Sequence, residues 1–279
     1  MIERKFEKEI SIWKPWRADT AGTLSQAYNE DIKMWKGYRF IKIEEDREAT
    51  EAIIKKYYPQ LKDLFLYVAG NSIWPNIGQL DFCDFASKAK ILDGVVNISG
   101  IDRTFIAATL KVVETTQPCL GLRRFEFLEI LVRLSNIKYL ETKIVKTYPQ
   151  AAEKLFQNII QNFSHDTWQE FRNSQLWTMD VNDLLDANMA NLQKIYNNYK
   201  TPTKQFMELV DCIRMATEDA NLGMSEKDIT FCYGYCHMTV QIEERHWKKY
   251  NGLEFVEFLE FIGRLAHTRF KNSSAELAN

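Results

Sequence analysis

From residue 47 onwards, apolar positions recur at intervals of three and four residues, which is the period of an amphipathic α-helix. The first stretch begins at 47 and contains the pairs Ile53–Ile54 and Tyr57–Tyr58 on one face. Seven further stretches follow at 101–110, 125–134, 149–163, 181–199, 205–216, 226–240 and 254–267. No convincing strand is longer than a few residues. The pattern therefore predicts an all-α fold.

One part of this pattern occurs twice. Residues 121–134 read GLRRFEFLEILVRL and residues 252–265 read GLEFVEFLEFIGRL, so that eight of fourteen aligned positions are identical. Two upstream pairs match in the same order: 101–105 with 227–231, and 80–85 with 204–209. A repeat of this kind predicts two similar helical units, 47–140 and 180–270, joined by a helical connector, 141–179.

Both repeats end in Gly-Leu-x-x-x-Glu-Phe-Leu-Glu, which resembles the end of an EF-hand loop. In that motif an apolar residue at loop position 8 pairs with the neighbouring loop, and an acid at position 12 opens the exiting helix. The resemblance places position 12 at Asp84, Glu126, Glu208 and Glu257. Position 8 is then Leu80, Leu122, Lys204 and Leu253. It implies two tandem EF-hand-like units, as in calmodulin.

The calcium ligands of such loops are missing. A Ca²⁺ ion takes six to eight oxygens, largely from positions 1, 3 and 5 and from the acid at 12. Positions 1, 3 and 5 hold Ile73, Pro75 and Ile77, then Thr115, Gln117 and Cys119, then Asn197, Tyr199 and Thr201, and finally His246, Lys248 and Tyr250. One carboxylate per loop does not replace the hydration shell of the ion, so we expect no metal site and no cofactor.

The sequence of the first unit also resembles the sequences of a narrower protein family. Residues 57–69 (YYPQLKDLFLYVA), 101–107 (IDRTFIA) and 124–134 (RFEFLEILVRL) resemble the degenerate EF-hand-pair proteins of cilia and flagella, especially those of ciliates. Members of that group are fixed components of axonemal doublet microtubules, inside the lumen or at the inner junction. The resemblance implies a structural role in the cytoskeleton of the cilium, with tubulin and other axonemal proteins as partners, and it supplies no catalytic residues.

Residues 1–46 lie outside this resemblance and show no sustained period. Nine basic residues oppose six acidic ones over 1–43, a local charge of +3. Large aromatic side chains among prolines, glycines and basic residues are typical of interface anchors. We expect an extended docking arm, with partner-binding candidates Trp13, Trp16, Arg17, Trp35, Tyr38 and Arg39. The alternative is that the arm packs on its own body. Residues 271–279 are expected to form a polar tail.

Composition narrows the function classes further. With 36 basic and 38 acidic residues among 279, the chain lacks the basic excess of a general nucleic-acid binder. The sequence contains no run of about 18 apolar residues, so we expect no membrane-spanning helix. The spacing Cys232-x-x-x-Cys236-His237 could suggest a metal site, but His237 would point about 100° away on the helix, which favours buried thiols. Phosphate-binding and nucleophile motifs are absent, so we expect no enzyme.

The sequence thus favours a non-catalytic structural protein of the axoneme. Two alternatives share the fold: a Ca²⁺-responsive regulator that exposes a groove for a target helix, and an adaptor elsewhere in the cytoplasm. The loop chemistry favours the structural protein over the regulator.

Overall fold

A computed structural model describes residues 5–110, 120–165, 168–200 and 206–271 of the chain. Within these ranges there are thirteen α-helices, several short 3₁₀- and π-helical turns, and isolated β-bridges without a β-strand. The prediction of an all-α fold is confirmed. None of the helices in the described ranges has both the length and the hydrophobicity that crossing a bilayer needs.

The chain forms two compact units. The first unit consists of Thr20–His165 and Gln241–His246, and the second of Met1–Asp19, Asp166–Val240 and Trp247–Asn279. The boundary at 165 and 166 falls inside the predicted connector 141–179. The connector is therefore not a separate element, because its helices belong to the units on either side.

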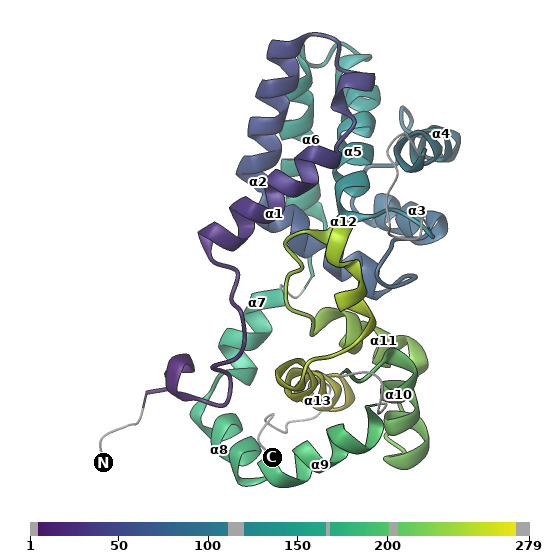
Figure 1. Cartoon of the computed structure of the whole chain (residues 1–279). Coiled ribbons are helices and arrows are strands. Elements are labelled where there is room, and N and C mark those ends of the chain that lie inside the picture. The colour runs from purple at the N-terminus through teal and green to yellow at the C-terminus, as the bar shows by residue number, and fades with distance from the viewer. Residues whose placement is uncertain (1–4, 111–119, 166–167, 201–205, 272–279) are drawn as a thin grey trace. The chain divides into compact units, whose positions relative to one another are not determined.

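The first unit is built around three long helices that run side by side in Figure 1: α2 (Glu44–Gly70), α5 (Arg124–Ser135) and α6 (Tyr148–Asn162). Its other helices are α1 (Ala21–Met34), α3 (Gln79–Lys88), α4 (Ile98–Thr109) and α12 (Glu243–His246). Three acids in the first turn of α2 stabilise this helix, because negative charges interact favourably with the dipole at a helix N-terminus. Pro149 lies in the first turn of α6, where its missing N–H costs no hydrogen bond. Rings of Phe65, Phe82, Phe85 and Phe127 pack together in the core.

The second unit repeats the order helix, loop, helix. Its helices are α7 (Trp168–Phe171), α8 (Met179–Ala187), α9 (Met189–Tyr199), α10 (Leu209–Arg214), α11 (Glu226–Tyr235) and α13 (Phe255–Phe270). The core contains Tyr196 of α9, whose ring lies 5.5 Å from that of Phe258 in α13, and the fully buried Phe261.

An antiparallel bridge joins two loops in each unit. In the first unit the amides and carbonyls of Ile77 and Leu122 exchange hydrogen bonds of 3.0 and 2.8 Å. In the second unit Met207 and Leu253 do the same at 3.4 and 2.9 Å. A Cβ on Gly121 would lie 2.3 Å from the carbonyl oxygen of Ile77, and one on Gly252 would lie 2.4 Å from Cβ of Phe206. The repeated glycine is required because the partner loop passes directly against it.

The long fourth loop contains a segment that belongs to the first unit. Glu243 of α12 accepts a hydrogen bond of 3.2 Å from the amide of Arg124, the first residue of α5. The guanidinium of Arg124 in turn donates to both carboxylate oxygens of Asp31 in α1, at 2.6 and 3.0 Å. All three side chains are buried. This network ties α1, α5 and α12 together within the first unit.

Candidate functional site

Four helices follow a paired loop, and in each of them the third residue is an acid. Glu126 and Glu257 hold this position in α5 and α13, as the sequence predicts. Because Leu122 pairs with Ile77 and Leu253 pairs with Met207, the equivalent acids in α3 and α10 are Asp81 and Asp211. Those two replace the predicted residues Asp84 and Glu208.

The two predicted residues lie elsewhere on the helices. Asp84 is in the second turn of α3, where its exposed carboxylate pairs with Lys88 at 2.7 Å. Glu208 is the N-cap of α10, and its amide donates to Asp211 at 3.4 Å. The error is three residues in both loops, and it arises because acids three residues apart fit the local pattern equally well. The bridge between the loops decides between them.

Glu126 is held by an arginine of its own loop. Its fully buried carboxylate accepts hydrogen bonds from the amide of Arg123 at 2.9 Å and from Nε of the same residue at 3.0 Å. The Nη2 group of Arg123 makes a further short contact. The side chain of Arg123 is 3% exposed, so the ion pair lies away from solvent. The positive charge that a bound cation would bring to this carboxylate is thus supplied by the chain.

Glu257 is held by backbone amides instead. Its carboxylate accepts from the amide of Met238 at 2.7 Å and from that of Glu254 at 2.7 Å. Burial raises the pKa of Glu257 to about 8, against the lowering effect of the two amide donors. Both oxygens of this carboxyl group are therefore already bonded to backbone amides of the chain.

The remaining two acids also bond within the chain. The Ser72 hydroxyl donates to Asp81 at 2.5 Å and accepts from the amide of Gly78 at 2.8 Å, which closes the first loop on itself. Asp211 accepts from the amide of Glu208 and from the guanidinium of Arg214 at 3.5 Å. All four acids thus serve as caps and bridges of their own loops.

With the corrected register, positions 1, 3 and 5 of the first loop are Gly70, Ser72 and Trp74, which offer one side-chain oxygen. In the second loop Thr115, Gln117 and Cys119 lie outside the described residues, and so does Thr201, which the sequence register had placed at position 5 of the third loop. Across the ranges that the structure describes, no group of three or more His, Cys, Asp or Glu side chains is placed to hold a metal ion.

A second acid of each repeat has a role that was not predicted from the sequence. Glu129 and Glu260 are fully buried, and each accepts from an arginine one turn later in its helix, Arg133 at 2.9 Å and Arg264 at 2.8 Å. A second cation completes each cluster: Lys36 of the first unit lies 3.8 Å from Glu129, and Arg172 of the second donates to Glu260 at 2.7 and 2.8 Å. An acid in the middle of an apolar helix face was the signal that could have revealed both.

The prediction that residues 1–46 form one docking arm on the surface is wrong. Residues 5–19 belong to the second unit, and residues 20–46 belong to the first, where they include α1. Trp13, Trp16 and Trp35 are buried at 0%, 2% and 5% exposure. The ring of Trp16 lies 6.2 Å from that of Trp168 and 4.2 Å from the guanidinium of Arg172. These tryptophans are core residues, because tertiary packing gives their large apolar rings a buried place without any helical period.

The other three candidates of the arm lie nearer the surface. Tyr38 is 52% exposed, and Arg39 is half-buried. Arg17 pairs with Glu254 at 3.2 Å, and its side chain is 54% exposed. The structure therefore leaves Tyr38 and Arg17 as exposed members of the predicted set.

Cys232, Cys236 and His237 lie in or directly after α11 and are all buried. Nδ1 of His237 lies 2.8 Å from the carbonyl oxygen of Tyr233, and burial lowers the pKa of this imidazole to about 4. Burial also raises the pKa of the Cys232 thiol to about 11. The side chains are neutral groups of the core, in line with the interpretation as buried thiols.

Comparisons of the chain with protein-family models, with curated proteins and with solved structures find no match.

Replacing Glu126 by glutamine tests the role of the Arg123–Glu126 pair. An exposed first-turn acid would contribute little, but this carboxylate is buried and accepts three hydrogen bonds from one arginine. We expect Glu126→Gln to lower the free energy of unfolding by about 1.5–3 kcal/mol, the range for hydrogen bonds to charged groups. Denaturant titration followed by circular dichroism measures this. Asp84→Asn is the matched control and should leave the stability unchanged, whereas equal effects would show that burial of Glu126 is not decisive.

The raised pKa of Glu257 leads us to expect that the stability of the fold depends on pH. The folded state retains a proton on Glu257 up to about pH 8, whereas the unfolded state loses it near 4.5, so stability falls as the pH rises through that window. His237 has the opposite effect, but only between about pH 4 and 6.5. From pH 6.5 to 8 we therefore expect Glu257 to destabilise the fold by at most about 1.4 kcal/mol per pH unit.

The variant Glu257→Gln isolates this effect, because the amide does not titrate. The free energy of unfolding is measured in urea at several pH values between 6.5 and 8 for both proteins. The slope of the wild type minus that of the variant should be negative. Parallel slopes would mean that Glu257 is ionised in the folded protein throughout this range.

Proposed function

We propose that this chain is a non-catalytic structural protein of the ciliary axoneme. In this proposal two degenerate EF-hand pairs act as rigid binding modules for tubulin or for neighbouring proteins of the doublet microtubule. The observation that carries it is the closure of the paired loops by groups of the chain itself, above all by Arg123 on Glu126.

The hand-pair interpretation is supported by three features that recur in both units. A reciprocal bridge joins two loops, an acid stands four residues after each bridged residue, and a glycine precedes the bridged leucine. The order α2–α3–α4–α5 in the first unit is matched by α9–α10–α11–α13 in the second. The features support the interpretation because in paired EF-hand loops position 8 pairs with the neighbouring loop and the acid at position 12 opens the exiting helix.

Rigidity follows from how the loop acids are used. A calcium sensor changes shape because the ion recruits a position-12 carboxylate that is free in the closed state. Here Glu126 and Glu257 already hold buried donors, Arg123 and the amide of Met238. Recruiting them to an ion would break those bonds, so the alternative of a Ca²⁺-responsive regulator is disfavoured.

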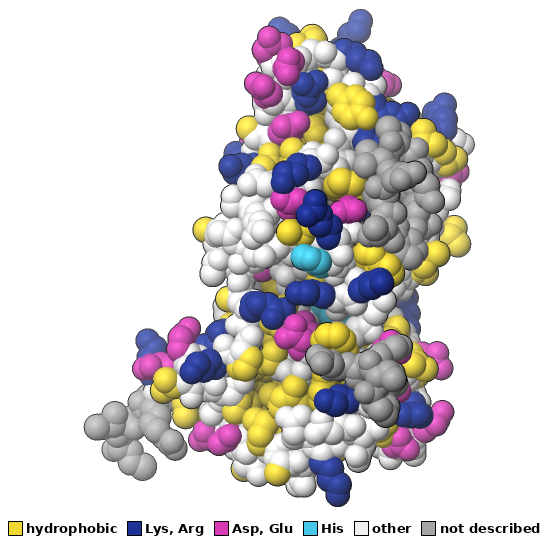
Figure 2. All heavy atoms as spheres, viewed as in Figure 1, with side chains coloured by type: hydrophobic (Ala, Val, Ile, Leu, Met, Phe, Trp, Pro, Cys, Tyr) yellow, Lys and Arg dark blue, Asp and Glu magenta, His cyan; other side chains and the backbone are white. Residues whose placement is uncertain are grey.

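A non-catalytic role is supported by the burial and the raised pKa values of three cysteine thiols, which would be the strongest nucleophiles of the chain. Cys212, Cys232 and Cys236 are buried, and burial raises the pKa of each thiol, so each has little thiolate character. On the face shown in Figure 2, basic and acidic side chains are interspersed within each unit. A nucleic-acid binder would present a concentrated basic patch there, so a protein partner is favoured.

The axonemal location rests on the family resemblance of residues 57–69, 101–107 and 124–134. It is tested by expressing the tagged protein in ciliated cells, removing the membrane with detergent and extracting the dyneins with salt. We expect the protein to remain with the doublet microtubules, both with Ca²⁺ and with a chelator. Release by detergent or salt would contradict the proposal, and release by the chelator alone would favour the calcium-responsive regulator.

A further inference from the structure

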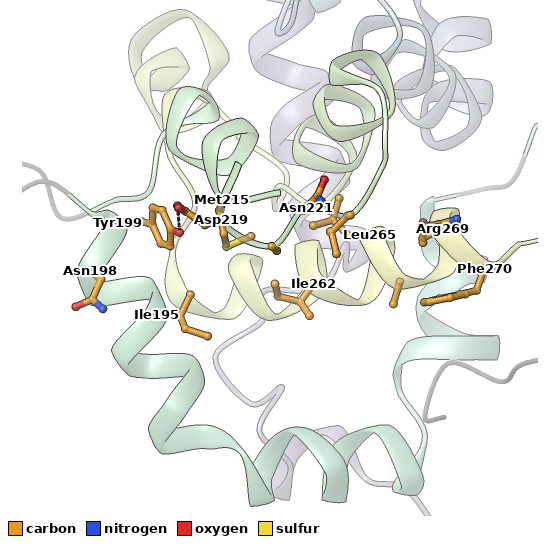
Figure 3. Close-up of a pocket in the computed structure, with 13 residues that line it drawn as sticks. Ile195, Asn198, Tyr199, Met215, Asp219, Asn221, Ile262, Leu265, Arg269 and Phe270 are labelled. Carbon is orange, nitrogen blue, oxygen red and sulfur yellow. Dashed lines mark hydrogen bonds between the residues drawn. The ribbon is translucent and has the colours of Figure 1, made fainter. Parts of the chain in front are cut away.

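The second unit carries an apolar pocket along one side of α13 (Figure 3). Its volume is about 690 Å³, and all of its lining belongs to the second unit. The apolar part of the lining includes Ile195, Met215, Leu222, Ile262, Leu265 and Phe270. Figure 3 shows Asp219 and Tyr199 at one end of the pocket and Arg269 beside Phe270 at the other. The pocket is thus a long apolar trough with a charged group at each end.

The repeat identifies the same surface in the first unit. Continuing the match of α5 with α13 pairs Leu131 with Ile262, Lys138 with Arg269 and Tyr139 with Phe270. The match also holds for the turn after α3 and after α10. Lys90 and Asn221 have positive φ angles of 55° and 46° there, and the next residues, Ile91 and Leu222, donate to equivalent alanine carbonyls.

In the first unit this surface is covered by the helix α6. The ring of Phe163, the C-cap residue of α6, lies 5.1 Å from that of Phe85, the counterpart of Met215. The side chain of Asn158 donates to the carbonyl oxygen of Ala89, and Nζ of Lys154 lies 5.5 Å from the ring centre of Tyr139. The buried stripe of α6 consists of Ala151, Ala152, Leu155, Phe156 and Ile159. An amphipathic helix therefore fills the site that is a pocket in the second unit.

The difference in exposure follows from this cover. Tyr139 is 7% exposed beneath α6, whereas its counterpart Phe270 is 53% exposed. Leu131 and Ile91 are fully buried, whereas Ile262 and Leu222 line the open pocket. The second unit thus displays apolar positions whose equivalents are buried by a helix in the first.

The charges also differ at one point. Lys138 of the first unit pairs with Asp93 at 2.7 Å, but the position that matches Asp93 in the second unit is Met224. Within the described residues Arg269 forms no ion pair, and its guanidinium stands next to the ring of Phe270 at 5.8 Å. A ligand that lies along the trough can therefore supply the carboxylate that the second unit lacks.

We propose that this pocket binds an amphipathic helix of a partner protein, which presents an apolar stripe like that of α6 and a carboxylate opposite Arg269. The inference goes beyond the proposed function, because it names the chemistry of one partner and does not depend on where in the cell that partner lies. Helices bind grooves of this kind through apolar anchors spaced three and four residues apart.

The test uses a fluorescent peptide with the sequence of residues 147–163, which carries the stripe of α6. Added to the full-length protein, it should bind in a saturable manner at concentrations below about 100 μM, measured by fluorescence anisotropy. A peptide in which Leu155 and Phe156 are replaced by asparagine should not bind. In the protein, Phe270→Ser should weaken binding about tenfold or more, as expected for the loss of a large aromatic contact of the interface. Val210→Ser, an exposed apolar side chain outside the pocket, should not.

A second peptide tests the charge. Lys154 of α6 lies over Tyr139, so in the second unit the same position of the peptide would meet Phe270 and Arg269. The peptide with Lys154→Glu should bind about 3–10-fold more tightly than the unchanged one, which corresponds to about 0.7–1.4 kcal/mol. The variant Arg269→Ala should abolish this difference. An unchanged preference in that variant would contradict the assigned carboxylate.

Three other results would overturn the proposal. The first is the absence of saturable binding, or binding that Phe270→Ser leaves intact. The second is a tenfold gain in peptide affinity when residues 272–279 are removed, which would make the end of this chain the occupant. The third is self-association of the protein that Phe270→Ser abolishes in sedimentation velocity, which would make a second copy the occupant.

Discussion

A chain that begins at residue 46 is expected to aggregate or to melt many degrees below the full-length protein. The truncation removes Trp13 and Trp16 from the core of the second unit and Asp31 and Lys36 from buried ion pairs of the first. Loss of Asp31 alone leaves the guanidinium of Arg124 buried without its carboxylate, a change that costs about 3–5 kcal/mol in other proteins. Thermal melting and size-exclusion chromatography measure the outcome.

Two point variants separate this result from a general effect of truncation. Trp16→Ala should cost about 3–5 kcal/mol, because a fully buried ring is replaced by a cavity. Tyr38→Ala, at an exposed aromatic position of the same arm, should have little effect on stability. If the truncated chain instead stays soluble and melts like the full-length protein, residues 1–45 would be the docking arm that the sequence predicts.

Replacing Glu260 by alanine is expected to have a comparably large effect on the second unit. Its carboxylate is fully buried and accepts from Arg172 at 2.7 and 2.8 Å and from Arg264 at 2.8 Å. Arg172 is itself fully buried between the rings of Trp16 and Trp168, and burial lowers the pKa of its guanidinium. Without the carboxylate, two guanidinium groups remain buried side by side.

We expect Glu260→Ala to lower the free energy of unfolding by about 3–5 kcal/mol, the range for removing one partner of a buried ion pair. The measurement is denaturant titration followed by the fluorescence of the seven tryptophans, which include Trp16 and Trp168 beside Arg172. Glu218→Ala, an exposed glutamate of the same unit, is the control and should be close to wild type. A small loss for Glu260→Ala would mean that the two arginines reach solvent when the acid is removed.

The helical fold and the two similar paired loops were predictable from sequence because their signals are local, whereas the bounds of the two compact units differ from the predicted 47–140 and 180–270. The period of three and four residues marks each helix, and the Gly-Leu repeat at 121 and 252 marks both paired loops. The glycine and leucine have their places for a physical reason, since the leucine forms the bridge and the glycine makes room for the other loop. Glu126 and Glu257 were placed correctly for the same reason.

What the sequence did not reveal depends on contacts between distant residues. The register of the first and third loops is set by the loop that pairs with each of them, so that Asp81 and Asp211 could not be distinguished from Asp84 and Glu208. The burial of the N-terminal tryptophans depends on rings more than a hundred residues away, such as Trp168. The ion pair of Glu260 with Arg172 joins residues 88 positions apart.

Paired loops that are closed by protein groups should need no ion. Calorimetric titration of the metal-free protein with Ca²⁺ tests this directly, with circular dichroism to follow helix content and a calcium sensor as the positive control. We predict no saturable heat and no change in helix content at tens of micromolar Ca²⁺. A stoichiometric site with a dissociation constant below about 10⁻⁵ M, the weak end of the sensor range, would contradict closure of the loops by the chain itself.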